Sequence, residues 1–158
     1  MFFDGFLSCS ASYFTSYYVG QQLIGSLVEI EGFVCHHWAV IVEVVGETVY
    51  VIHLTNDDMV RRSTLVDCAK GDRVRINNSW DNWSSPYAPE TIVKRAQSKL
   101  GYCKYHTLTY NCETFATWCR NGDEFSGQTL RTLMFAPVTL PALGLYKLFG
   151  GSGGPSNC

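Results

Sequence analysis

Hydrophobic and polar positions divide the chain into a strand-rich first half and a helix-rich second half. Apolar side chains dominate residues 27–30, and two longer apolar runs, residues 38–45 and 48–54, flank Gly46-Glu47. Apolar runs joined by a short glycine-containing connection predict a β-hairpin. Residues 73–76 alternate charged and apolar side chains, as an edge or half-exposed strand does. We therefore predict an antiparallel sheet in the first half.

Two helices are predicted in the second half, after a loop rich in Asn, Trp, Ser and Pro at residues 77–87. The first begins at Pro89, because proline is well suited to the first helical position, and stops before Gly101. Its core-facing residues recur at helical spacing and are Ile92, Val93, Ala96 and Leu100.

The second helix runs from the N-cap Asn111 to Gly122 and carries Cys112 in its first turn. Its buried stripe consists of Phe115, Trp118 and Cys119. Together the two halves predict an α+β fold, in which an antiparallel sheet packs against helices.

Composition indicates one folded domain that does not bind nucleic acid. The chain has 158 residues, of which 46% are hydrophobic, enough for a core of its own. The chain has 12 Lys and Arg residues and 14 Asp and Glu residues, so it lacks the excess of positive charge that binds the phosphate backbone of a nucleic acid. Seven scattered cysteines are an odd number that favours free thiols in a reducing compartment, and Asp4 argues against a secretory signal. We expect a cytoplasmic protein.

The C-terminal part predicts two further segments after a domain at residues 1–130. Residues 131–149 form an apolar tail, uncharged between Arg131 and Lys147. Pro137 and Pro141 would interrupt a helix that crosses a membrane, so the tail is expected to lie at the membrane surface as a peripheral anchor. Residues 150–158 are rich in Gly, Ser and Pro and are expected to be flexible.

Cys112 is the candidate nucleophile. A cysteine reacts as its thiolate, and the positive end of a helix dipole favours that anion. The amide groups of the same first turn are also placed to hold the oxyanion of a tetrahedral intermediate. The other interpretation of Cys112 is an inert cysteine in the helix core.

His37 and His53 are the candidate partners of the nucleophile, because they lie on the two strands of the predicted hairpin. A neutral imidazole can take the thiol proton, and a second polar group can hold its tautomer. His53 can instead be a buried histidine bonded to a backbone carbonyl. His36 should point to the opposite face, and His106, between the helices, is more typical of the surface.

A zinc site is a further alternative, since Cys35, His36, His37, Cys103 and His106 all carry suitable ligand atoms. Contiguous ligands on a strand point to alternating faces, and the usual paired spacing is missing. We therefore expect neither a metal nor a cofactor.

The order of these motifs resembles the lecithin:retinol acyltransferase domain and its phospholipase/acyltransferase relatives. The resemblance covers roughly residues 23–127, and its motifs lie at residues 25–30, 37–42, 51–54, 74–78, 91–96 and 110–115. It implies a circularly permuted papain-like/NlpC-like fold, with Cys112 as nucleophile, His37 as base and His53 as the orienting third member. It also implies a thioester with an acyl chain from a membrane phospholipid, which passes to an amine, an alcohol or water.

Two positions depart from that pattern. Thr114 stands where the family usually has histidine, and the segment between the two histidines is longer than usual. Viral H-box/NC proteins share the histidine box and the Asn-Cys pair and act chiefly by binding host or viral factors. A regulatory binding module with protein partners is therefore the alternative to the enzyme. A cysteine peptidase is a third class, but the apolar tail favours lipid over peptide.

Overall fold

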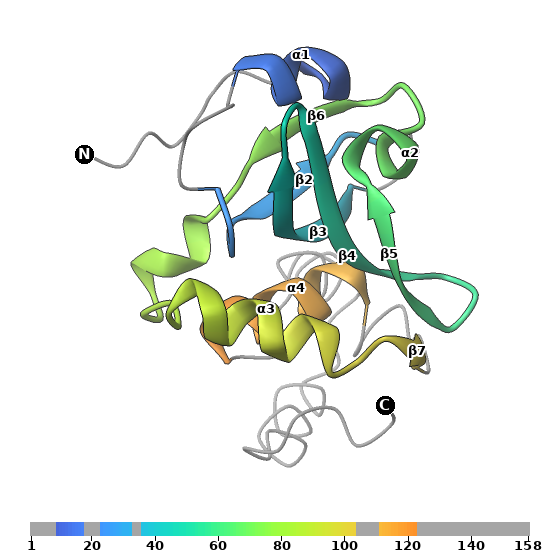
Figure 1. The fold of residues 1–158 in the computed structure, drawn as a ribbon. Coiled ribbons are helices and arrows are strands. Elements are labelled where there is room, and N and C mark those ends of the chain that lie inside the picture. Colours follow the sequence, from blue (N-terminus) through green and yellow to red (C-terminus); the bar gives the residue numbers. More distant parts are fainter. Residues whose placement is uncertain (1–8, 18–22, 33–35, 104–110, 123–158) are drawn as a thin grey trace, which may run out of the picture.

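A computed structural model describes residues 9–17, 23–32, 36–103 and 111–122 of the chain as a mixed α+β fold (Figure 1). All strand pairs are antiparallel, and the seven described strands follow the order β1-β6-β2-β3-β4-β5-β7. The strands are β1 (Cys9–Ser10), β2 (Leu27–Ile30), β3 (His37–Val45), β4 (Thr48–Thr55), β5 (Met59–Thr64), β6 (Arg73–Ile76) and β7 (Gly101–Tyr102). The α+β prediction is confirmed, whereas the permuted papain-like topology stays a prediction.

The predicted hairpin is formed by β3 and β4. The connection is Gly46-Glu47, and Gly46 has φ 57°, a left-handed conformation that glycine adopts without strain. The predicted strands at residues 27–30 and 73–76 are β2 and β6. Strand β6 is half-exposed, as predicted, but lies between β1 and β2 rather than at the sheet edge.

Strand β5 and the helix that follows it have no counterpart in the sequence-based prediction. The β5 segment carries Arg61 and Arg62 and lacks a clear apolar alternation, yet it pairs with β4 along its whole length. The guanidinium of Arg62 stacks on the Tyr50 ring at 4.0 Å and pairs with Glu43, which stabilises a polar strand. Helix α2 (Leu65–Ala69) follows, with Thr64 as its N-cap. The Thr64 hydroxyl accepts a hydrogen bond from the Asp67 amide.

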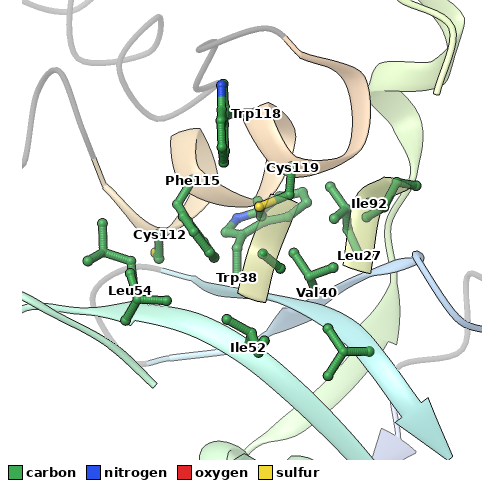
Figure 2. Packing of buried hydrophobic residues seen from close by; sticks show 14 of the residues in the cluster. Leu27, Trp38, Val40, Ile52, Leu54, Ile92, Cys112, Phe115, Trp118 and Cys119 are labelled. Atoms are coloured by element: carbon green, nitrogen blue, oxygen red, sulfur yellow. The ribbon is translucent and has the colours of Figure 1, made fainter. Parts of the chain in front are cut away.

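The helices cover both faces of the sheet (Figure 1). Helices α3 (Pro89–Gln97) and α4 (Cys112–Asn121) lie on one face, and α1 (Ala11–Tyr17) and α2 lie on the other. Between α4 and the sheet, Figure 2 shows a core that includes Leu27, Trp38, Val40, Ile52, Leu54, Ile92, Cys112, Phe115 and Cys119. The core on the other face includes Phe14, Val28, Ala39, Ile41, Val49, Val51 and Leu65. The sheet is therefore buried between two apolar layers.

The two predicted helices are present, with one correction. Pro89 opens α3, and Ile92 and Ala96 are buried as predicted. Leu100, however, is 46% exposed, because α3 ends at Gln97 and the chain turns toward β7. Arg95 fastens α3 to α4: its guanidinium stacks on the Trp118 ring at 4.0 Å and donates to the Trp118 carbonyl.

The loop at residues 77–87 is anchored to α4 rather than free. It contains a short 3-10 helix, η1 (Ser79–Asn82). Arg120 of α4 pairs with Asp81 at 2.6 Å and donates to the Gly25 carbonyl at 2.8 Å. One arginine thus joins α4, the loop and the approach to β2.

The prediction that all cysteines are free is wrong for Cys103, which is disulfide-bonded. Cys9, Cys68, Cys112 and Cys119 are free thiols. Of the described helices, none is long and apolar enough to cross a membrane. The apolar tail at 131–149 and the segment at 150–158 lie outside the described residues, so the predictions made for them stay predictions.

The two-layer burial of the hairpin leads to a test of stability. Ile52→Ala should lower the free energy of unfolding by ~2–5 kcal/mol, because Ile52 is fully buried and the change leaves a cavity. Val45→Ala is the matched control in the same hairpin: Val45 is 57% exposed, and the loss should stay below ~1 kcal/mol. Denaturant unfolding measures both, and equal losses would contradict the described burial.

Candidate active site

Cys112 is the first residue of α4, and the reason is local. Asn111 is in an extended conformation, and its side-chain oxygen accepts hydrogen bonds from the amides of Glu113 and Thr114. Asn111 is therefore a strong N-cap. Gly122 ends the helix at φ 85°. The predicted boundaries and the position of Cys112 in the first turn are confirmed.

The amides of Glu113, Thr114 and Phe115 in this first turn are already occupied. Besides the two amides held by the Asn111 side chain, the Phe115 amide donates to the Asn111 carbonyl. An oxyanion held by Glu113 or Thr114 would therefore compete with the Asn111 cap. The prediction that these amides hold the oxyanion has to include displacement of that cap, whereas the helix dipole acts on the thiolate without rearrangement.

The Cys112 sulfur lies beside the start of β3. Its Sγ is 3.9 Å from the carbonyl oxygen of His36, the residue before β3 begins, and the side chain is 4% exposed. The thiol packs among the apolar residues between α4 and the sheet, close to Phe115 and Leu54 in Figure 2. Cys112 is thus buried next to the residue that precedes His37.

His37 and His53 contact each other as the hairpin geometry predicts. His37 Nε2 lies 2.8 Å from His53 Nδ1, and the two rings are nearly perpendicular. His53 Nε2 in turn lies 3.1 Å from the Ser63 hydroxyl of β5, so a serine rather than a backbone carbonyl satisfies its second nitrogen. Sequence reasoning missed Ser63, because β5 has no clear strand pattern.

The alternation along the strands assigns the histidine pair to the α2 side of the sheet, and Cys112 lies at the start of β3. On β3, Trp38 and Val40 face α4, whereas Ala39 and Ile41 face α2; His37 shares the second parity. His53 likewise alternates with residues that face α4, and Cys68 of α2 lies close to both rings. A hydrogen-bond partner of His37 is therefore on β4: the Nε2 of His37 is hydrogen-bonded to His53.

His36 points to the side opposite to His37, as predicted. Its Nδ1 lies 2.8 Å from Glu29 Oε1, and Arg75 and Asn77 hold the other oxygen of the same carboxylate. Glu29 is almost fully buried, so these partners compensate for the loss of water around its charge.

A cavity of about 560 Å³ opens next to this network and to α4. Its lining includes His36, Trp38, Trp80, Trp83 and Glu113. Because Glu113 follows Cys112 and the His36 carbonyl touches the Cys112 sulfur, the cavity is adjacent to the candidate nucleophile.

Both histidines are held in the neutral form. Burial lowers the pKa of His37 to about 4, and the charge of Lys70 acts in the same direction. Burial also lowers the pKa of His53 to about 4, assisted by His37, Arg61 and Lys70 and opposed by Asp57. In contrast, burial raises the pKa of Cys119 far above that of an ordinary thiol, as expected for an inert cysteine on the core stripe.

The zinc ligands weighed from the sequence do not assemble within the described residues. Cys35 and His106 lie outside them, Cys103 is disulfide-bonded, and His36 faces away from His37. A different set of possible ligands does lie close together: the ligand atoms of His37, His53 and Cys68 are all within 4.8 Å of one another.

Comparison with known proteins bears on this arrangement. The family model of lecithin retinol acyltransferase matches residues 21–125, which contain the hairpin, both histidines and Cys112. The chain belongs to the lecithin retinol acyltransferase family. It is 32% identical to phospholipase A and acyltransferase 2 of Homo sapiens over 146 residues, covering 80% of this chain and 88% of the relative.

Two further relatives support the same family. Phospholipase A and acyltransferase 1 of Homo sapiens is 28% identical, covering 87% of this chain and 90% of the relative. Lecithin retinol acyltransferase of Homo sapiens is 32% identical over 71 residues, 44% of this chain and 31% of that protein. The resemblance identified from the sequence motifs is therefore confirmed at the level of the family.

The neutral histidines lead to a test of pH dependence. The folded state holds both pKa values near 4, below the value of 6.5 for a free imidazole, so the unfolded chain binds more protons between these limits. The contribution of the two histidines to the free energy of unfolding should be constant above pH ~6.5. The free energy of unfolding should fall as the pH drops from ~6.5 toward 4. Denaturant unfolding at a series of pH values measures the slope.

The control is the double variant His37→Asn with His53→Asn. It should flatten the dependence between pH ~6.5 and 4, because the two titrating rings are removed. An unchanged slope in the double variant would show that other groups cause the pH dependence.

Proposed function

We propose that this chain is a cysteine-dependent phospholipid acyltransferase and A-type phospholipase that forms an acyl-thioester on Cys112. The observation that carries the proposal is the position of Cys112: a capped helix start, next to the strand that begins with His37. The family relationship supports the reaction class, since its relatives are named phospholipase A and acyltransferase. The acyl group then passes to an amine, an alcohol or water.

The reaction has two steps, acylation of Cys112 and transfer of the acyl group to the acceptor. The Cys112 thiol loses its proton to His37, its sulfur attacks the ester carbonyl of a phospholipid, and the carbon–sulfur bond forms. Collapse of the tetrahedral intermediate breaks the ester carbon–oxygen bond, and the leaving alkoxide takes the proton from His37 as a lysophospholipid departs. The acceptor then gives its proton to His37, attacks the thioester and releases the Cys112 thiol.

The hydrogen bonds of the histidine pair support one assignment of atoms. If His37 donates from Nε2 to His53 Nδ1, His53 carries its proton on Nε2 and donates to Ser63. The lone pair of His37 is then on Nδ1, which is the atom that takes the thiol proton. His53 and Ser63 thus select the reactive tautomer of His37.

Proton transfer takes place at the start of β3. The Cys112 sulfur touches the His36 carbonyl there, and its charge acts on Cys68, which lies beside both imidazoles, so the thiol reaches His37 at this end of the strand. The cavity lined by His36, Trp38 and Glu113 is the proposed place for the polar part of the substrate, next to the reacting sulfur.

The nucleophile is tested with Cys112→Ser. The variant should keep the fold but lose the acyl adduct, because a hydroxyl of similar size stays protonated at neutral pH. The full chain is incubated with mixed phosphatidylcholines and analysed by intact mass spectrometry. Cys119→Ser is the matched control on the same helix and should keep the adduct.

A fatty-acyl adduct in the Cys112→Ser variant would remove Cys112 from its proposed role. Absence of any adduct and of lipid turnover in the unmodified chain would favour the H-box/NC-type binding module instead.

The proposed pairing of base and nucleophile is tested by a double-mutant cycle. His37→Ala and Cys112→Ser should each abolish most turnover, and combining them should cost little more than either change alone, since the two groups act as one unit. His53→Ala should cause a smaller loss, because it frees the His37 ring without removing it. Steady-state hydrolysis rates measure all four proteins, and additive losses would show that the residues act independently.

We also propose that the tail at residues 131–149 attaches the protein to membranes. An apolar stretch with a basic residue at each end, Arg131 and Lys147, fits an interfacial position. Removal of residues 131–158 should reduce vesicle flotation and activity on vesicles, whereas hydrolysis of short-chain, water-soluble esters should persist. Equal flotation of the two proteins would assign the tail to the folded domain.

A further inference from the structure

The side chains of His37, His53 and Cys68 converge on the α2 side of the sheet. Their ring nitrogens and sulfur all lie within 4.8 Å of one another. The three residues come from β3, β4 and α2, so the fold and not the local sequence brings them together. The proposed reaction uses the two histidines and has no role for Cys68.

The partners of these groups orient them as ligands. His53 Nε2 is held by the Ser63 hydroxyl, which leaves Nδ1 directed at His37 Nε2, 2.8 Å away. A hydrogen-bond partner on the second nitrogen of a histidine is the usual outer-shell arrangement at metal sites. His37 and Cys68 are partly exposed, whereas His53 is buried, so an ion can approach from the side of Cys68.

The chemistry of the three groups suits a cation. Imidazole binds a metal as the neutral ligand, and a thiol binds as the thiolate once the metal displaces its proton. The charged groups near His53 are Lys70, Arg61 and Asp57.

We propose that His37, His53 and Cys68 form a binding site for a divalent cation of the zinc type, with a water molecule as the fourth ligand. Two imidazoles and one thiolate match the preference of zinc and cobalt for nitrogen and sulfur, and three protein ligands leave a position open. Binding replaces the proton of Cys68 by the metal and releases that proton to the buffer.

Binding changes the spacing of the ligand atoms slightly. Zinc–nitrogen bonds of ~2.0–2.1 Å at tetrahedral angles separate two nitrogens by ~3.3 Å, so the ion moves the rings of His37 and His53 apart by ~0.5 Å. The proton that the two rings share moves to His37 Nδ1, and the imidazole stays neutral. The Cys68 sulfur should lie ~3.6 Å from the nitrogens in the bound state. It lies on the five-residue helix α2, which follows β5 directly.

A bound ion should switch off acyl transfer, a consequence that rests on the proposed function. The metal would occupy His37 Nε2 and leave the imidazole proton on Nδ1, so His37 would have no lone pair for the proton of Cys112. The binding site itself does not depend on that reaction, and the two parts are tested separately.

The test of binding titrates the reduced full chain with Co²⁺ and records its absorption. A bound thiolate should add a sulfur-to-cobalt charge-transfer band, and the ligand-field bands should have the intensity of a tetrahedral site. Cys68→Ser should remove the charge-transfer band, whereas Cys9→Ser, a matched change at another partly exposed free thiol, should keep it. Cys112→Ser should also keep the band.

Two further measurements test the site even if Cys68→Ser fails to fold. His53→Gln should weaken Co²⁺ binding by at least ~10-fold, since loss of an outer-shell partner alone costs 10–100-fold. Calorimetry with Zn²⁺ at pH 7 in two buffers of different ionisation enthalpy should report one proton released per ion.

A charge-transfer band that is absent from the folded unmodified chain, or that disappears with Cys112→Ser but not with Cys68→Ser, would overturn the site. Zn²⁺ should also inhibit turnover of the unmodified chain far more than that of Cys68→Ser. Equal inhibition of both would overturn the regulatory part. If the unmodified chain has no turnover without metal, the proposed function fails, and the spectroscopic result still decides the site.

Discussion

The alternation of side chains along β3 is the constraint on which both halves of the candidate site depend. Trp38 and Val40 pack against α4, and Ala39 and Ile41 pack on the α1 and α2 side. Because burial on both faces fixes the register, a shift of one residue would exchange the two apolar layers. This alternation directs His36 to the buried carboxylate of Glu29 and His37 to His53.

The proposed chemistry combines two kinds of stabilisation from different elements. Helix α4 favours the thiolate of Cys112 through its dipole, while the Asn111 side chain occupies the amides of Glu113 and Thr114. The sheet favours neutral imidazoles through burial, so His37 remains a base without a carboxylate partner. The two contributions meet at the start of β3, where the sulfur contacts the His36 carbonyl.

Helix α2 gives this member of the family a second possibility at the same histidines. Cys68 brings a thiol next to both histidines, and Ser63 holds the far nitrogen of His53. One histidine pair can therefore serve a proton or a metal ion, and the nitrogen of His37 that carries its proton decides between them. Acyl transfer and metal binding are exclusive on this interpretation.

The sequence by itself determined the features that depend on neighbours along the chain. Gly46-Glu47 between apolar runs predicted the hairpin, and Asn111 and Gly122 predicted the helix that begins at Cys112. Strand alternation also predicted that His37 and His53 face each other and that His36 points away from them. The tertiary structure alone brought Ser63 and Cys68 to the histidines. These contacts depend on the pairing of β5 with β4 and on the packing of α2. Strand β5, with Arg61 and Arg62, lacks the alternation of apolar residues from which a strand is predicted. Its stability comes from cross-strand contacts such as that of Arg62 with Tyr50.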